Sequence, residues 1–187
     1  TYIKDLKEYV GKEVSISGFV HTIRVQSKII FIILRDITGL VQLVAMKDNA
    51  NFDLAKDLSS ESVIKISGTV KEEKNAIGGV EIHPDTLVVL SKSNPELPIP
   101  VVTKKGNEET EAPIRFDYRW LDLRKPEKAK IFKVWTMLEK GFRDYYLNNN
   151  FIQVYSPSFM STPAETGAEV FEVKYFRHSL FLDYRDT

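Results

Sequence analysis

The sequence predicts an all-β barrel followed by the beginning of an α+β domain. Residues 13–46 are dense in β-branched residues that alternate along the chain, whereas residues 126–150 space their apolar residues by three and four. Four prolines in the segment 93–125 separate these patterns, and proline both fixes φ and lacks an amide donor. We therefore expect a first domain over 1–92, an extended and semi-rigid connection over 93–125, and a partial second domain over 126–187.

The first domain contains five strand patterns and one short helical pattern. The second strand pattern, KIIFIILRD, is apolar on both faces, and Thr38-Gly39 supplies a turn before the third, so these two form a hairpin. The order strand, strand, strand, short helix, strand, strand is that of an OB-fold, a small barrel whose outer strand face commonly binds oligonucleotides. The strands are expected at 13–20, 28–36, 40–46, 62–70 and 80–90, and the helix within 51–60.

The second domain begins with Pro126, which suits the first turn of a helix. The spacing predicts a long amphipathic helix that ends near Asn148-Asn149-Asn150. A short strand is then expected over FIQVYSP (151–157), stopped at Pro157. A helix and one strand cannot close a core, so this domain is expected to be incomplete.

Composition narrows the function. The 187 residues are 43% hydrophobic and 28% charged, with no apolar run long enough to span a bilayer, and the charged N-terminus lacks a signal-peptide pattern, so we expect a cytoplasmic protein. There is no cysteine and the three histidines are scattered, so no metal site is expected. With 26 basic and 26 acidic residues, any nucleic acid should be bound through shaped contacts on one face rather than through bulk charge.

Phe31 and Gln42 are candidate binding residues on the predicted barrel. Phe31 shares its alternation phase with Ile29 and Ile33, and one of the two faces of this strand must leave the core. An outward Phe31 would offer a ring for base stacking, whereas an inward one would be a core residue. Gln42 interrupts an apolar strand, either as a contact residue or as part of a solvated face.

Three segments, in order, resemble class II aminoacyl-tRNA synthetases of the aspartate, asparagine and lysine subgroup. Residues 18–44 resemble the anticodon-binding OB domain, and RFDYRWLDLRKPE (115–127) resembles the signature at the entry to the catalytic domain. The long helix with FIQVYSPSFM (151–160) resembles the class II motif 1, and AETGAEVFEVKYF (164–176) is most similar to the aspartyl enzymes. The resemblance ends after Phe176, which indicates a chain that is truncated or lacks an internal segment there.

The resemblance implies roles for four residues of the barrel. It implies that Phe31 stacks on an anticodon base, that Gln42 reads a base edge, and that Glu81 and Arg24 contact the anticodon. Surface charge is the alternative for Glu81 and Arg24. Arg24 also falls on the presumed core phase of its strand, so its role requires a bulge or kink after Gly18.

The resemblance also implies roles beyond the barrel. Pro157 corresponds to the motif 1 proline at the homodimer interface, although any strand could end at a proline. Glu165 corresponds to a carboxylate that binds the amino-acid ammonium, with a solvated loop glutamate or a role for Glu169 as alternatives. The family uses ATP and Mg²⁺, but the sequence contains neither the motif 2 nor the motif 3 arginine pattern, so no catalytic residue is expected within this chain.

We therefore expect an aspartate-tRNA ligase that recognises the anticodon through its barrel and, when complete, attaches aspartate to tRNA through an aspartyl-adenylate. The expected partners are tRNA, aspartate and a second copy of the chain, with no membrane. Two alternatives stay open: a noncatalytic OB module that binds tRNA or single strands, and an asparaginyl- or lysyl-tRNA synthetase.

Overall fold

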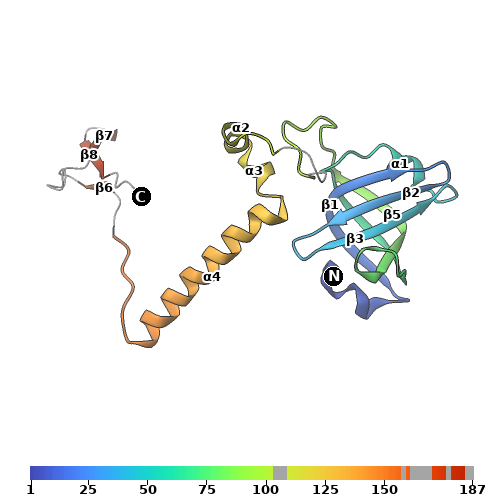
Figure 1. Ribbon diagram of the computed structural model, residues 1–187, viewed down its shortest axis with the longest axis horizontal. Helices are drawn as coiled ribbons and strands as arrows, with labels where there is room; N and C mark the ends of the chain where they lie inside the picture. The colour runs from blue at the N-terminus through green and yellow to red at the C-terminus, as the bar shows by residue number, and fades with distance from the viewer. Residues whose placement is uncertain (103–108, 157–158, 161–169, 176–177, 184–187) are drawn as a thin grey trace. The chain divides into compact units, whose positions relative to one another are not determined.

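The chain forms two compact units, Thr1–Ala129 and Lys130–Thr187, and each is described by itself. Figure 1 shows the computed structural model. The residues that the structure describes are 1–102, 109–156, 159–160, 170–175 and 178–183.

Five strands form a closed barrel in the order β1-β2-β3-β5-β4, with helix α1 between β3 and β4 in the sequence (Figure 1). This confirms the predicted OB-fold. The β2–β3 pair is the predicted antiparallel hairpin, and β3 and β5 run parallel where the barrel closes. The elements are η1 (Ile3–Tyr9), β1 (Glu13–Val25), β2 (Ile29–Arg35), β3 (Leu40–Met46), α1 (Phe52–Lys56), β4 (Val63–Glu72), η2 (Ile77–Gly79) and β5 (Val80–Ser91).

The barrel core is built from alternate residues of all five strands. In β2, Ile30, Ile32 and Leu34 are fully buried, and in β4 Ile64 and Ile66 are as well. The close approach of strands requires glycine at Gly68, since a Cβ there would lie 2.2 Å from the carbonyl oxygen of His83. Alternation of this kind leaves the other half of each strand facing outward, where a ligand can reach it.

The connection after the barrel is partly helical rather than extended throughout. Helices α2 (Ala112–Asp117) and α3 (Arg119–Asp122) lie within the expected 93–125 connection, and α2 has a proline in its first turn. Leu121 of α3 packs in a small buried cluster with Ile99 and Val101. The prolines of this segment suggested an extended chain. The burial of these apolar side chains, which composition alone does not reveal, orders part of the segment instead.

The second unit contains most of the predicted long helix, α4 (Pro126–Asn148). A three-stranded sheet in the order β6-β8-β7 follows, from β6 (Phe159–Met160), β7 (Val170–Tyr175) and β8 (His178–Asp183). The strand predicted over 151–157 is wrong for the residues that the structure describes, because 151–156 pair with no other strand. An apolar extended sequence becomes a strand only where a neighbour accepts its backbone hydrogen bonds.

Candidate nucleic-acid interface

The outer face of β2 carries Phe31. Its neighbours in the chain, Ile30 and Ile32, are fully buried, whereas Phe31 itself is half-buried, together with Ile29 and Ile33. The structure therefore selects the outward orientation from the two that alternation allowed. A half-buried ring on the outside of a barrel strand is held rigidly and still offers surface for stacking.

Arg24 lies beside this ring because β1 contains a bulge. The register of β1 against β2 shifts between Val20 and Thr22, so the residues that face the core change from one alternating set to the other. Arg24 therefore faces outward and pairs with Phe31. The guanidinium of Arg24 lies 5.3 Å from the centre of the Phe31 ring. This is the irregularity that the assignment of Arg24 to the outer face required. It places a positive charge next to the aromatic surface, where the phosphate of a bound nucleotide would be attracted.

Gln42 and Glu81 meet where the barrel closes. They are register partners in the parallel β3–β5 pair, and Gln42 Nε2 donates to Glu81 Oε2 at 3.0 Å. Gln42 also pairs with Ile33 across β2–β3, and Ile33 pairs with Thr22 of β1. The four predicted anticodon residues thus occupy the outer side of adjacent strands β1, β2, β3 and β5. We call Arg24, Phe31, Gln42 and Glu81 the outer-face site.

Two residues that sequence reasoning missed continue this site. His83 Nε2 lies 2.7 Å from Glu81 Oε1, and its Nδ1 lies 3.3 Å from Lys71 Nζ. His83 is two residues from Glu81 on β5, so strand alternation alone could have placed it on the same face. Lys71 of β4 is the register partner of Glu81, which no pattern within one strand could reveal.

A second polar cluster joins the barrel to the connection. Glu61 is buried, and its Oε2 accepts hydrogen bonds from Arg35 at 2.9 Å and from Arg124 at 2.7 Å. The guanidinium of Arg124 also lies 4.5 Å from the Phe19 ring centre and 5.3 Å from that of Trp120. We call Phe19, Arg35, Glu61, Trp120 and Arg124 the connector clamp. These contacts attach the α3 region to the outside of the barrel.

His21 borders the connector clamp, with its Nδ1 3.1 Å from a guanidinium nitrogen of Arg35. Burial and the positive charge of Arg35 lower the pKa of His21 below its ordinary value, and the negative charge of Glu61 only partly offsets them. A neutral imidazole can accept a hydrogen bond from Arg35, so the lowered pKa is consistent with this geometry.

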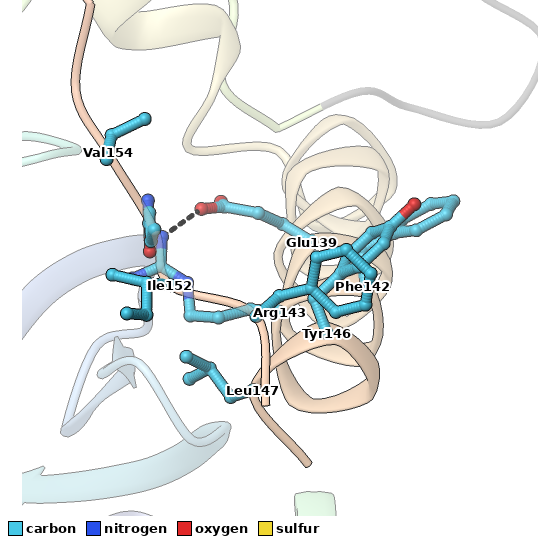
Figure 2. A pocket seen from close by; sticks show the side chains of 9 residues that line it. Glu139, Phe142, Arg143, Tyr146, Leu147, Ile152 and Val154 are labelled. Atoms are coloured by element: carbon cyan, nitrogen blue, oxygen red, sulfur yellow. Dashed lines mark hydrogen bonds and ion pairs between the residues drawn. The ribbon is translucent and has the colours of Figure 1, made fainter. Parts of the chain in front are cut away.

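A shallow hollow of about 380 Å³ lies along the C-terminal half of α4. Figure 2 shows the side chains of Phe142, Tyr146 and Leu147 from the helix and of Ile152 and Val154 from the chain that follows it. An ion pair between Arg143 and Glu139, 2.9 Å long, crosses its rim (Figure 2). The lining is mostly apolar, which fits a protein side chain better than a phosphate or a charged amino acid.

Glu165, Glu169 and Pro157 lie outside the described residues, as does the junction between Phe176 and Arg177. Within the described ranges, no three acidic, histidine or cysteine side chains gather in a way that could hold a metal ion. In the same part of the chain, no helix combines the length and apolar character needed to cross a membrane.

The five-stranded barrel has the fold of oligonucleotide-binding modules, and comparison with known proteins finds the same kind of domain. Residues 14–90 match the family described as OB-fold nucleic acid binding domain. Residues 111–184 match the tRNA synthetases of class II (D, K and N). The two matches follow one another along the chain, which is therefore similar to this class II synthetase family in the order of its parts.

Curated relatives carry consistent names. The chain is 36% identical over 97% of its length to the aspartate–tRNA(Asp/Asn) ligase of Archaeoglobus fulgidus, of which it covers 43%. It is 37% identical over 97% of its length to the aspartate–tRNA(Asp) ligase of Picrophilus torridus, of which it covers 42%. The chain thus spans about two fifths of the length of these relatives.

Solved structures share the fold. The asparaginyl-tRNA synthetase of Pyrococcus horikoshii, complexed with asparaginyl-adenylate, superposes with a TM-score of 0.85 at 33% identity, over 97% of this chain and 42% of that one. A putative aspartyl-tRNA synthetase of Leishmania major gives a TM-score of 0.83 over 97% of this chain and 39% of that one. Its identity is 24%, so this second likeness concerns the fold alone.

Proposed function

We propose that this chain is the anticodon-recognising part of an aspartate-tRNA ligase. The observation that carries the proposal is the outer-face site, which sets an aromatic ring, a guanidinium, an amide and a carboxylate on one side of an OB barrel. The names of the curated relatives support aspartate as the amino acid. The complete protein would form aspartyl-adenylate from ATP and aspartate and transfer aspartate to tRNA in the cytoplasm.

Three residues of the outer-face site have distinct tasks in this proposal. Phe31 stacks on an anticodon base, and stacking is worth about 1–3 kcal/mol per base. The Gln42 amide hydrogen-bonds a base edge, which supplies specificity, and Arg24 meets the backbone phosphate, which supplies affinity without sequence preference. Single-stranded loops suit this arrangement because their bases can be splayed out onto a protein surface.

The proposed reaction uses ATP and Mg²⁺, but we assign no binding site for either to the described residues. Among those residues no cluster of carboxylates could hold the metal, so the fit is poor and no catalytic step is assigned to them. Glu165 and its alternative Glu169 remain candidates for binding the aspartate ammonium. The buried carboxylate of Glu61 is already bound by two arginines.

The test measures binding of short RNA hairpins that carry the aspartate anticodon loop. We expect Phe31→Ala to weaken binding by about 1–3 kcal/mol while the free energy of unfolding changes little, because the ring is on the outer face. Tyr2→Ala is the matched control, since Tyr2 is an exposed aromatic on the segment before η1. An equal loss in both variants, or a barrel destabilised by Phe31→Ala, would contradict the stacking role.

The same hairpins separate the alternatives. A hairpin with the asparagine anticodon bound more tightly than the aspartate hairpin would favour an asparaginyl enzyme, which the likeness to the Pyrococcus horikoshii structure makes the second candidate. Equal binding of every single-stranded loop would indicate a noncatalytic single-strand-binding module instead.

A homodimer is the remaining part of the proposal. It is supported by the exposed apolar row on α4 and by the resemblance of this helix to motif 1.

A further inference from the structure

We propose that His83 is a positioning residue for anticodon discrimination, acting on Gln42 through Glu81 and assisted by Lys71. The inference rests on the proposed function and adds to it a residue that does not itself need to touch RNA. It is carried by one unbroken chain of polar contacts across β3, β5 and β4, in which Gln42, Glu81, His83 and Lys71 follow one another.

The carboxylate of Glu81 fixes the orientation of the Gln42 amide. An ionised carboxylate can only accept hydrogen bonds, so the Gln42 NH₂ group must face Glu81 Oε2, 3.0 Å away. The carbonyl oxygen of Gln42 and its second N–H are then the groups left for a base edge. If Glu81 turned away, the amide could flip and exchange its donor and acceptor positions.

His83 in turn fixes Glu81. Its Nε2 lies 2.7 Å from Glu81 Oε1, so both carboxylate oxygens are engaged, one by each neighbour. The Glu81 side chain is 14% exposed and that of His83 is 23% exposed, so both contacts are partly shielded from water. Without His83, Oε1 would be solvated and the long glutamate side chain would regain rotamers that the contact now excludes.

Lys71 selects the tautomer of His83 that this arrangement needs. The ammonium of Lys71 has only donors, so the Nδ1 atom 3.3 Å away must be the acceptor, and Nε2 must then carry the proton that is donated to Glu81. The backbone keeps the three residues close together, because Lys71 is the register partner of Glu81 and His83 lies two residues further along the same strand. The donor directions along the chain are therefore all determined.

The experiment measures the affinity of the full chain for the aspartate hairpin and for hairpins with one anticodon base changed. The readout is the ratio of the two affinities, which a merely structural residue would not change. We expect His83→Ala to lower this ratio about tenfold, the size of effect that loss of one oriented amide contact has on base discrimination. Affinity that does not depend on the anticodon should remain, because Phe31 and Arg24 are intact.

Four further variants make the test specific. His83→Gln should restore most of the ratio, since its amide NH₂ can occupy the position of Nε2 and donate to Glu81, whereas the shorter His83→Asn should not. Lys71→Met should lower the ratio less than His83→Ala does. Lys65→Met, which removes an exposed lysine of the same strand, is the control and should leave the ratio unchanged.

The outcomes distinguish this inference from the proposed function. A wild-type chain that binds every hairpin alike would overturn both. A wild-type chain that discriminates, together with His83→Ala and His83→Asn variants that discriminate equally well, would overturn only the role of His83. Failure of His83→Gln to restore discrimination, with the barrel still folded, would also overturn it.

Discussion

At the scale of single residues, Glu61 combines an unfavourable backbone with a favourable side-chain environment. Its φ of 68° lies in the left-handed region, where side chains with a Cβ are strained. Its carboxylate is buried between Arg35 and Arg124, and Oε1 has no hydrogen-bond partner within the described part of the chain. The two charge-assisted bonds to Oε2 therefore have to outweigh both the strain and the buried orphan oxygen.

We expect Glu61→Ala to lower the free energy of unfolding by about 3 kcal/mol, because two guanidinium groups lose their shared partner while Arg35 stays largely buried. Urea denaturation at neutral pH measures this loss. Glu61→Gly separates charge from strain: it also removes the carboxylate but relieves the backbone, so it should be more stable than Glu61→Ala by about 1 kcal/mol. An alanine variant as stable as the wild type would show that the connector clamp contributes nothing to folding.

At the scale of elements, the turn between β2 and β3 depends on Asp36. Its Oδ1 accepts hydrogen bonds from the backbone N–H groups of Thr38 and Gly39 and from the Thr38 hydroxyl, and its Oδ2 accepts from the backbone N–H of Ile3 at the start of η1. Burial alone would raise the pKa of Asp36, but these bonds outweigh it and lower the pKa below its ordinary value of 3.8. One carboxylate thus attaches η1 to the hairpin that carries Phe31 and Gln42.

The lowered pKa gives a prediction with a definite sign. The stabilising effect of ionised Asp36 is fully present above its unfolded-state pKa and is lost as the pH falls through the lower folded-state pKa. Asp36→Asn places an NH₂ group against backbone donors and should lower the free energy of unfolding at pH 7 by about 1–3 kcal/mol. The difference between the wild type and the variant should begin to shrink below about pH 4 and should disappear only below the lowered folded-state pKa.

Chemical denaturation of both proteins across this pH range checks the Asp36 prediction. His21, whose pKa is also lowered, destabilises the folded state as the pH falls below its ordinary value. That effect is common to the wild type and to Asp36→Asn, so it cancels in the difference between them. A difference that stays constant down to pH 3 would mean that the carboxylate charge is not what holds the turn.

The elements also show where sequence reasoning succeeds and where it stops. Alternation and spacing within one segment predicted the barrel strands, the hairpin and α4, because those patterns are local. The bulge that brings Arg24 beside Phe31 was required but could not be located between Val20 and Thr22 from the pattern alone. Lys71 contacts His83, and Arg124 contacts Glu61, although the residues of each pair are far apart in the sequence. The spacing of residues within one segment cannot predict such contacts.

At the scale of the whole molecule, the described residues leave one large apolar surface without cover. Residues Val134, Trp135, Leu138, Phe142 and Tyr145 recur on α4 at steps of one, three and four, which places them along one side of the helix. Trp135 is 63% exposed and Leu138 is 60% exposed within the single chain. Phe142 belongs both to this row and to the lining of the apolar hollow. A contiguous exposed patch of this kind is typical of a protein interface.

We expect a second copy of the chain to cover this surface, as the homodimer proposal requires. Sedimentation equilibrium should then give about twice the monomer mass of 21.5 kDa at micromolar concentration. Leu138→Glu should shift the equilibrium toward the monomer, because a charge would be buried against apolar side chains when two copies associate. Lys133→Glu changes an exposed residue outside the apolar row and is the control. A wild-type monomer would contradict pairing through α4. A dimer that persists in Leu138→Glu would place the interface on another surface. Hairpin binding by the outer-face site should be the same in all three proteins.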